Sequence, residues 1–500
     1  MNIKLSQSFL FINSKDYFSK NLIKMRKILT FAIAIISTEF TYAQLLNNDF
    51  EQQKKNTFTE WNFKKNDSYD VKIDSKEKHS KNNSLQIIGD NVDSKKFQAF
   101  SQKISINVDK MQKIEISAYI KSEKLMGHIN LFTQIRDAND NLIAFGNSET
   151  QKKFIPINQD WTKCTLEFII DEDAKNLVIG GLLSGKGNAW FDDFEIKYKD
   201  FSGKEPSEIA KKYIEDFKNI VQKNSIFSDK IDWQKINNNI EILSKGMESV
   251  EDTDIALYYI LKNLKKVGDK HSFIESKENF EKRKVSNPKG IEPEYQLINN
   301  NIGYIMVPGF NSANKEIANN FAEKIQNMIK KLDSENNIKG WVVDLRKNTG
   351  GNMYPMIAGL GSLVGEGNLG YFVAKNRKDT WKYENGKMGS YQYTIPPKIN
   401  SSDKKIAILI GKKTASSGEA TAIAFIGKNN VKLFGQPSGG FTSANRSFRL
   451  SDGKSIALAV SFEMDRTGKE YRSEIIPDVI IKPDANKDLD LETAQKWILE

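Results

Sequence analysis

The sequence is poor in the residue types that build disulfides and metal sites. Its 500 residues include one cysteine, Cys164, and three histidines. One cysteine excludes an intrachain disulfide. With so few histidines and no Cys-x-x-Cys or His-Glu-x-x-His spacing, a catalytic zinc site is not expected, and we expect no cofactor for catalysis. Cys164 lies in an alternating, strand-like run, which predicts a buried structural thiol rather than a nucleophile.

Long apolar runs and blocks of like charge are also missing. No segment after the N-terminal region reaches about 18 consecutive apolar residues, so we expect no membrane span in the mature chain. The 74 basic residues are interspersed with 64 acidic ones, and the net charge of +10 contains no long basic run. This pattern is typical of a solvated, lysine-rich surface and favours no nucleic-acid partner. The chain is long enough for two or three folded domains.

Residues 1–43 have the features of a signal peptide. A basic segment at 24–27 precedes a short apolar segment at 28–36, and Ala43 ends a small-residue cleavage site. Met25 is an alternative start, because the residues before it add nothing that a signal peptide needs. The alternative interpretation is an N-terminal membrane anchor. No cysteine follows the cleavage site, which argues against a lipoprotein, and we expect an exported protein, periplasmic or extracellular.

Residues 44–200 predict an all-β domain. Short alternating runs, among them 84–88, 113–120 and 129–135, are separated by clusters of Asn, Asp, Gly and Ser. Short strands at this spacing are typical of a β-sandwich.

The two ends of this domain resemble the jelly-roll, carbohydrate-binding-like modules of secreted bacterial enzymes. The resemblance rests on the Asn-Asn-Asp-Phe-Glu run that ends at Glu51 and on the Trp-Phe-Asp-Asp-Phe-Glu run that begins at Trp190. It implies that Glu51 and Asp193 help to hold a structural calcium and that the domain binds glycan. Trp61 or Trp190 could stack on a sugar ring, and the alternative is that both are core aromatics.

The rest of the chain changes from helical to mixed character. Apolar residues at helical spacing predict a small helical domain over 203–285, and a polar, charged stretch at 275–294 predicts a linker. Residues 296–485 alternate strand and helix, which indicates an α/β core. We expect strands at 302–307, 338–344, 405–411 and 431–434. We expect helices at 313–332 and from Ser417 onward.

Ser416 is the candidate nucleophile. It follows the apolar strand predicted at 405–411 and precedes the helix predicted from Ser417. A helix N-terminus offers unpaired backbone N–H groups and the positive end of the helix dipole, which are the parts of an oxyanion hole. The alternative is that Ser416 or Ser417 only caps the helix.

Two further features favour a catalytic interpretation of Ser416. Gly350 and Gly351 follow the strand predicted at 338–344, and a glycine pair lets the backbone approach a bound carbonyl, although the same pair also suits a simple turn. His271 is the one histidine outside the all-β domain. A serine nucleophile with an imidazole base therefore requires His271, although a lone histidine is often structural.

Together these segments resemble the C-terminal processing and tricorn-like serine peptidases over residues 205–485. The resemblance is carried by the runs 344–352, 414–419 and 476–479, in the family's order. It implies a crotonase-like α/β core and cleavage of a peptide or protein substrate by Ser416. It also implies that the oxyanion donors are the N–H groups of Ser417 and of Gly350 or Gly351.

The chain departs from the family pattern in three places. Phe441 stands where the serine–lysine branch has its lysine, so that dyad is absent. The histidine branch has a base in a Gly-Asp-x-His-like segment, matched by His271, and a carboxylate before the Pro-Asp motif, for which we take Glu474 rather than Glu470. The sequence after His271 has no room for a PDZ-type domain, so we expect the all-β domain or a loop at 367–393 to recruit substrate.

The sequence therefore predicts a secreted serine endopeptidase that works through a Ser416 acyl-enzyme with His271 as general base. Two alternatives stay open. A carbohydrate-ester hydrolase would use the same chemistry, although no Gly-x-Ser-x-Gly elbow surrounds Ser416. A catalytically degenerate peptidase fold with a glycan-binding module would be a binding protein.

Overall fold

The computed structural model describes residues 45–500 except 55–56, 64–65, 91–95, 202 and 286–290. The predicted signal peptide lies outside the described residues. The chain divides into two compact units, Met1–Phe201 and Ser202–Glu500. Within the described part, no helix is both long and apolar enough to cross a membrane.

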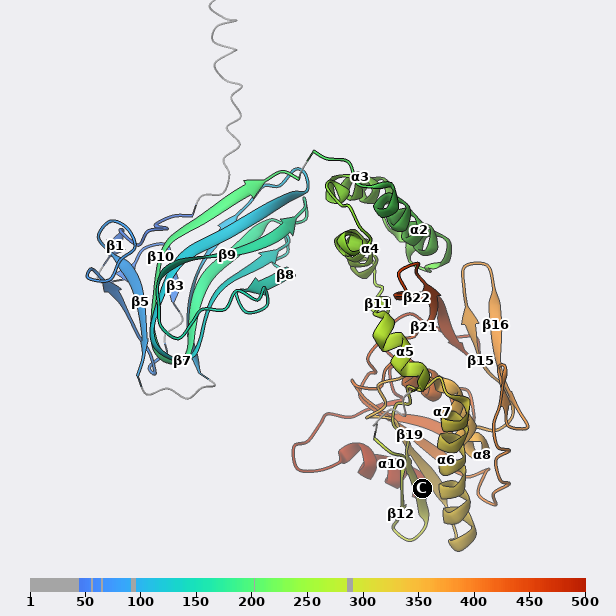
Figure 1. The fold of residues 1–500 in the computed structure, drawn as a ribbon. Coiled ribbons are helices and arrows are strands. Elements are labelled where there is room, and N and C mark those ends of the chain that lie inside the picture. Colours follow the sequence, from blue (N-terminus) through green and yellow to red (C-terminus); the bar gives the residue numbers. More distant parts are fainter. Residues whose placement is uncertain (1–44, 55–56, 64–65, 91–95, 202, 286–290) are drawn as a thin grey trace, which may run out of the picture. The chain divides into compact units, whose positions relative to one another are not determined.

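The N-terminal unit is the β-sandwich that the alternating runs predict (Figure 1). Its long strands β7 (Gln112–Arg136) and β10 (Asn176–Lys199) pair antiparallel along most of their length. β10 pairs β6 through its first half and β5 through its second half, so it joins two groups of strands. The other strands are β1 (Gln53–Lys54), β2 (Thr57–Phe58), β3 (Asn62–Phe63), β4 (Asp70–Asp74), β5 (Ser84–Gly89), β6 (Phe97–Ser105), β8 (Leu142–Asn147) and β9 (Gln159–Ile170).

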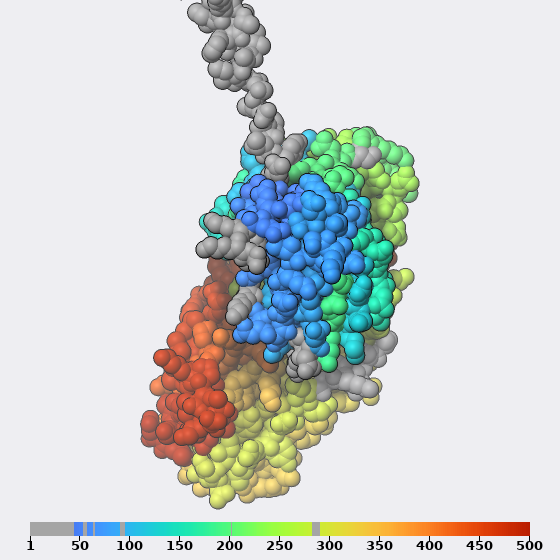
Figure 2. Space-filling model, turned by 90° about the vertical axis from the view of Figure 1, so that its left-hand side faces the viewer, coloured from blue at the N-terminus to red at the C-terminus, as the bar shows by residue number. Residues whose placement is uncertain are grey.

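Strand alternation builds the core of the sandwich. Ile114, Ile116, Ala118 and Ile120 of β7 are fully buried, because successive side chains of a strand point to opposite faces. Cys164 of β9 faces the same core, and burial raises the pKa of its thiol to about 11. It is the buried, unreactive thiol that the sequence predicted. Figure 2 shows the first part of this unit, in blue and cyan, as one closely packed surface.

Helices open the C-terminal unit, as their apolar spacing predicts. They are α2 (Glu208–Asn224), η1 (Ser228–Lys230), α3 (Trp233–Ser244), η2 (Glu251–Thr253), α4 (Asp254–Lys266) and α5 (Lys277–Val285). The polar stretch expected to be a linker thus contains α5. The Ile226 N–H donates to the Ala459 carbonyl at 3.1 Å. This segment belongs to one compact unit with the α/β core.

A mostly parallel sheet lies at the centre of the α/β core. Its order is β12-β13-β14-β19-β20-β24, and every neighbouring pair except β12–β13 is parallel. The strands are β12 (Glu294–Ile298), β13 (Ile302–Met306), β14 (Gly340–Asp344), β19 (Lys405–Ile410), β20 (Val431–Gly435) and β24 (Val479–Ile480). The helices are α6 (Lys315–Glu335), α7 (Met353–Gly359), α8 (Gly361–Val364), α9 (Ser417–Ile423) and α10 (Leu489–Leu499).

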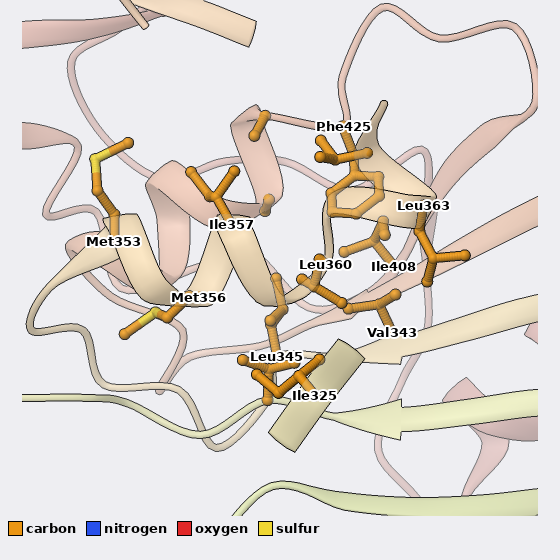
Figure 3. Packing of buried hydrophobic residues seen from close by; sticks show 14 of the residues in the cluster. Ile325, Val343, Leu345, Met353, Met356, Ile357, Leu360, Leu363, Ile408 and Phe425 are labelled. Atoms are coloured by element: carbon orange, nitrogen blue, oxygen red, sulfur yellow. The ribbon is translucent and has the colours of Figure 1, made fainter. Parts of the chain in front are cut away.

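Both faces of this sheet are covered, which is why its inner strands β14 and β19 are mostly apolar. Val343 and Ile408 point to the face covered by α6, α7 and α8. Figure 3 shows side chains of α7 and α8 over these two residues. Val342 and Leu409 point to the opposite face, where they meet Ala494 of α10. The predicted α/β core is confirmed.

A second, antiparallel sheet was not predicted from the sequence. β22 is its main strand and pairs with β11, β15, β21 and β23. The segment 367–393, expected to be a loop, forms β15 to β18 of this sheet. The strands are β11 (Phe273–Glu275), β15 (Gly367–Val373), β16 (Lys378–Glu384), β17 (Lys387–Met388), β18 (Tyr391–Gln392), β21 (Ser443–Arg449), β22 (Ser455–Asp465) and β23 (Glu470–Tyr471).

Candidate active site

Parallel pairing places the glycine pair and the candidate nucleophile at one edge of the central sheet. β14 and β19 are parallel neighbours, so the loops that follow them emerge side by side. The Ala415 N–H donates to the Asn348 carbonyl at 3.0 Å. A Cβ built on Gly350 would lie 2.8 Å from the Ser416 Cβ. Only glycine permits this approach, so Gly350 brings the turn against the nucleophile.

Ser416 has an unusual backbone conformation. Its φ is 54° and its ψ is −123°. A residue that only caps a helix normally has an extended backbone, and positive φ is sterically unfavourable for an L-residue with a side chain. Such strain concentrates at functional sites, where the surrounding structure maintains it. The backbone of Ser416 therefore favours the nucleophile interpretation over the cap interpretation.

The two glycines differ in what their N–H groups do. The Gly350 N–H donates to Asn348 Oδ1 at 3.0 Å and is already engaged. The N–H groups of Gly351 and Ser417 have no acceptor among the residues that the structure describes. The Ser417 hydroxyl donates to the Gly351 carbonyl at 2.7 Å, which holds the two residues together. The geometry thus leaves Ser417 and Gly351 as candidate oxyanion donors, and gives Gly350 a steric role instead.

His271 lies in the turn between α4 and β11. Asp269 Oδ1 accepts hydrogen bonds from the His271 N–H at 3.0 Å and from the Ser272 N–H at 2.9 Å, which fixes this turn. His271 Nδ1 donates to the Ser443 carbonyl at 2.8 Å. The proton on Nδ1 leaves Nε2 as the acceptor nitrogen. Burial lowers the pKa of His271, against smaller opposing effects of the Ser443 bond and Asp269, so the ring is neutral at pH 7.

Phe441 and Glu419 connect the histidine to the serine. The rings of His271 and Phe441 meet edge to face at 5.6 Å between centroids. Glu419 Oε2 accepts hydrogen bonds from the N–H groups of Phe441 and Ser416, both at 2.8 Å. No direct hydrogen bond joins the His271 and Ser416 side chains within the described ranges. Catalytic hydrogen bonds often tighten only when substrate is bound.

The prediction of Glu474 as the group that orients His271 is wrong in this structure. Glu474 Oε1 pairs with Lys270 Nζ at 3.3 Å at the surface, and a hydrogen bond to its own backbone together with Lys270 lowers its pKa. The alternative, Glu470, pairs with Arg472 at 2.7 Å. His271 Nδ1 instead bonds to a backbone carbonyl, that of Ser443. No carboxylate is therefore needed to fix its tautomer.

The proposed calcium ligands are each engaged by protein groups of the segment 79–83. Glu51 Oε1 accepts from the N–H groups of Asn82 and Asn83 at 2.9 and 2.8 Å. Asp193 instead binds the side chains of His79 and Ser80, at 2.6 and 2.8 Å. Among the described residues there is no group of three or more His, Cys, Asp or Glu side chains that could hold a metal ion.

A lysine supplies positive charge near these carboxylates. The Lys81 ammonium pairs with Asp49, and this bond, with weaker attraction from Glu51 and Asp193, raises the pKa of Lys81. N–H donors and an ammonium group thus surround the oxygens that a calcium ion would require. The residues present do not fit the calcium site that the resemblance implied.

The two tryptophans considered for sugar stacking belong to the interior. Trp61 is 5% exposed, and its indole N–H donates to the Asn47 carbonyl at 2.9 Å. Trp190 is 3% exposed and donates to Asp74 at 2.9 Å. Neither presents a free ring face, so the core interpretation of both is confirmed.

Comparison with known proteins identifies the family. Residues 301–481 match peptidase family S41, and residues 42–180 match a carbohydrate binding domain. The nisin-resistance protein of Lactococcus lactis subsp. lactis is 33% identical over 261 residues, which cover 51% of this chain and 78% of that protein. The chain belongs to peptidase family S41. The matched S41 region contains Ser416 and the glycine pair, whereas His271 precedes it.

Two further relatives are similar to parts of this S41 chain. The chloroplastic carboxyl-terminal-processing peptidase 2 of Arabidopsis thaliana is 26% identical over 161 residues, 32% of this chain and 28% of that protein. The structure of a lipoprotein from Streptococcus agalactiae is 30% identical and superposes with a TM-score of 0.49, covering 59% of this chain and 97% of that one.

Three residues of the site were not singled out in the sequence. Glu419 stands in the Thr-Ala-Ser-x-x-Glu run, and an acid at the third position of a helix is a recognisable capping signal. Asp269 precedes His271 by two residues, which suits a side chain that caps a turn. The Ser443 carbonyl carried no signal, because every residue has one.

Proposed function

We propose that this S41 chain is an exported serine endopeptidase in which Ser416 is the nucleophile and His271 the general base. The observation that supports this most directly is the strained backbone of Ser416 beside two N–H groups that lack an acceptor in the described structure, those of Ser417 and Gly351. A strained serine beside free N–H groups suits attack on a carbonyl.

The proposed reaction is acyl transfer in two halves. His271 Nε2 takes the proton of the Ser416 hydroxyl as its oxygen attacks the peptide carbonyl carbon, and the N–H groups of Ser417 and Gly351 stabilise the oxyanion. His271 then gives the proton to the leaving amine, and the C–N bond breaks. Water, deprotonated by His271, hydrolyses the ester and restores Ser416. The Ser443 carbonyl keeps the proton of the histidine on Nδ1 throughout.

A fluorophosphonate probe tests the nucleophile. We expect the wild-type chain to be labelled, and Ser416→Ala to abolish the labelling. His271→Ala should slow labelling and peptide turnover by about 10⁴-fold, the scale of loss when one member of a catalytic unit is removed. Ser447→Ala, at an exposed serine of β21, is the matched control and should label normally. Labelling that survives in Ser416→Ala would exclude Ser416 as the nucleophile.

Substrate assays distinguish the kinds of hydrolase. We expect turnover of denatured protein and of extended peptides, with nisin included because a relative is named for resistance to it. Turnover of acetylated sugars without peptide cleavage would indicate an ester hydrolase instead. A wild-type chain that neither labels nor turns over any substrate would be a binding protein.

We also propose that the N-terminal domain binds glycan and that the chain is exported with cleavage before Gln44. The match to a carbohydrate binding domain supports the first point, and the basic and apolar segments before Ala43 support the second. Retention of the protein on insoluble polysaccharides tests glycan binding. N-terminal sequencing of the exported protein tests cleavage before Gln44. A protein that passes through every polysaccharide column, or keeps residues 1–43, would contradict the respective point.

A further inference from the structure

One buried carboxylate collects hydrogen bonds from the whole surroundings of Ser416. Glu419, the third residue of α9, has no exposed surface. Its Oε1 accepts from the Ser438 hydroxyl and, at 2.8 Å, from the Gly440 N–H. Its Oε2 accepts from the N–H groups of Ser416 and Phe441, both at 2.8 Å. Four donors thus bind one side chain.

These donors come from segments that are distant in sequence. Ser416 is the candidate nucleophile, and Phe441 packs against the His271 ring. Ser438 also accepts a hydrogen bond from the Ile475 N–H at 2.8 Å, which adds the segment before the Pro-Asp motif. Glu419 is therefore the point at which the nucleophile turn and the loop beside the histidine are held together.

We propose that Glu419 is a positioning residue of the peptidase site: it holds Ser416 in its positive-φ conformation and fixes the loop that sets the position of His271. This inference rests on the proposed function. Four donors require an acceptor-only side chain, which an ionised carboxylate is and an amide is not. In Glu419→Gln, the amide NH₂ would face two of these donors. At least one of the two donor segments would then have to move away.

A second buried carboxyl group provides a matched control. Glu463 of β22 is 2% exposed, and its Oε2 has no hydrogen-bond partner in the described part of the protein. Its side chain makes no hydrogen bond to Ser416 or to the loop 438–441 in the same part. Glu463→Gln therefore makes the same chemical change at similar burial and removes no hydrogen bond of the nucleophile turn, although Glu463 lies near enough to Glu419 to respond to its charge.

The test compares Glu419→Gln and Glu463→Gln in the full-length protein. For Glu419→Gln we expect the fluorophosphonate labelling rate and kcat to fall about 100-fold, the loss expected from a misplacement of about 1 Å. KM should stay within about threefold, because Glu419 does not face the substrate. For Glu463→Gln both rates should stay within about threefold. Ser438→Ala, which removes one donor and keeps the carboxylate, should lose about tenfold in kcat, and it serves as the test if Glu419→Gln does not fold.

The possible results separate this inference from the proposed function. A labelled wild-type protein with unchanged kcat in both Glu419→Gln and Ser438→Ala would overturn the role of Glu419 alone. Equal losses in Glu419→Gln and Glu463→Gln would also overturn it, because they would reflect general destabilisation. A wild-type protein that the probe does not label would overturn both proposals.

Discussion

At the residue scale, Ser416 keeps a backbone conformation that costs free energy, of the order of 1–3 kcal/mol for such outliers. Its neighbours maintain that conformation. Glu419 binds its N–H, and Gly350 leaves space for its Cβ. The conformation of this serine thus depends on the Glu419 carboxylate and on the absence of a side chain at Gly350.

Gly350→Ala tests this dependence. The added methyl group would lie 2.8 Å from the Ser416 Cβ, and φ at Gly350 is +101°. We expect labelling by the fluorophosphonate probe to fall at least about 100-fold. Gly367→Ala is the control, because φ there is +110° and no atom lies within 4 Å of the added group. It should lower stability by about 1–3 kcal/mol and leave the labelling rate unchanged. Equal labelling rates in the two variants would contradict the prediction.

The lowered pKa of His271 predicts how kcat/KM depends on pH. Catalysis requires the neutral ring, so kcat/KM falls as the pH drops through the pKa of the free enzyme. Burial lowers this pKa, so we expect the midpoint of the acid limb below the ordinary histidine value of about 6.5. A pH profile of kcat/KM on a peptide substrate measures it. An acid limb with its midpoint at or above that value would show that the ring is not held neutral as described.

At the scale of elements, β22 brings a buried acid into the C-terminal unit. Burial, with a smaller contribution from the charge of Glu419, raises the pKa of Glu463 well above its usual value. The folded protein therefore keeps a proton that the unfolded chain releases. The stability from this proton is complete below the unfolded pKa and is lost as the pH rises toward the folded pKa.

Glu463→Gln should therefore flatten the dependence of stability on pH. Each unit by which the folded pKa exceeds the unfolded value costs about 1.4 kcal/mol once the pH is above both values. We expect the variant to gain stability over the wild type between about pH 5 and pH 8, as measured by chemical denaturation. If plots of the free energy of unfolding against pH run parallel for the two proteins, the pKa of Glu463 is not raised by folding.

The all-β domain makes a prediction about metal removal. Lys81 and the N–H groups of Asn82 and Asn83 occupy the surroundings of Asp49 and Glu51. We therefore expect a chelator to leave the unfolding temperature of this domain unchanged, and added calcium to produce no shift. A fall of several degrees with chelator, reversed by calcium, would show that a metal ion stabilises the domain.

The elements also show why part of the site could be predicted and part could not. Ser416 and the glycine pair follow apolar strands, and parallel pairing brings the ends of such strands together. The partner of His271 depends on where β21 lies after chain folding, and no side-chain pattern marks a carbonyl such as that of Ser443. The sequence position of Glu474 predicts a carboxylate near His271, whereas in the structure this carboxylate pairs with the surface residue Lys270.

At the scale of the whole molecule, the proposed peptidase site and the match to a carbohydrate binding domain fall in separate units. Every residue assigned to the peptidase site lies in Ser202–Glu500, which has its own hydrophobic clusters. A protein that begins at Ser202 should keep kcat on a short peptide within about twofold, because its core is complete. The same protein should lose retention on polysaccharide. A loss of kcat comparable to that of Ser416→Ala would show that the N-terminal unit contributes to the site.

The single cysteine gives this two-unit chain a built-in reporter. Cys164 is 7% exposed in the core of the sandwich, and its thiol titrates far above neutral pH. A thiol-directed reagent therefore reacts only when the sandwich opens. The reaction rate reads the local stability of the N-terminal unit without a label or a mutation, while fluorophosphonate labelling reads the other unit. One sample can thus show whether an added glycan or peptide changes the rate at which the N-terminal unit opens.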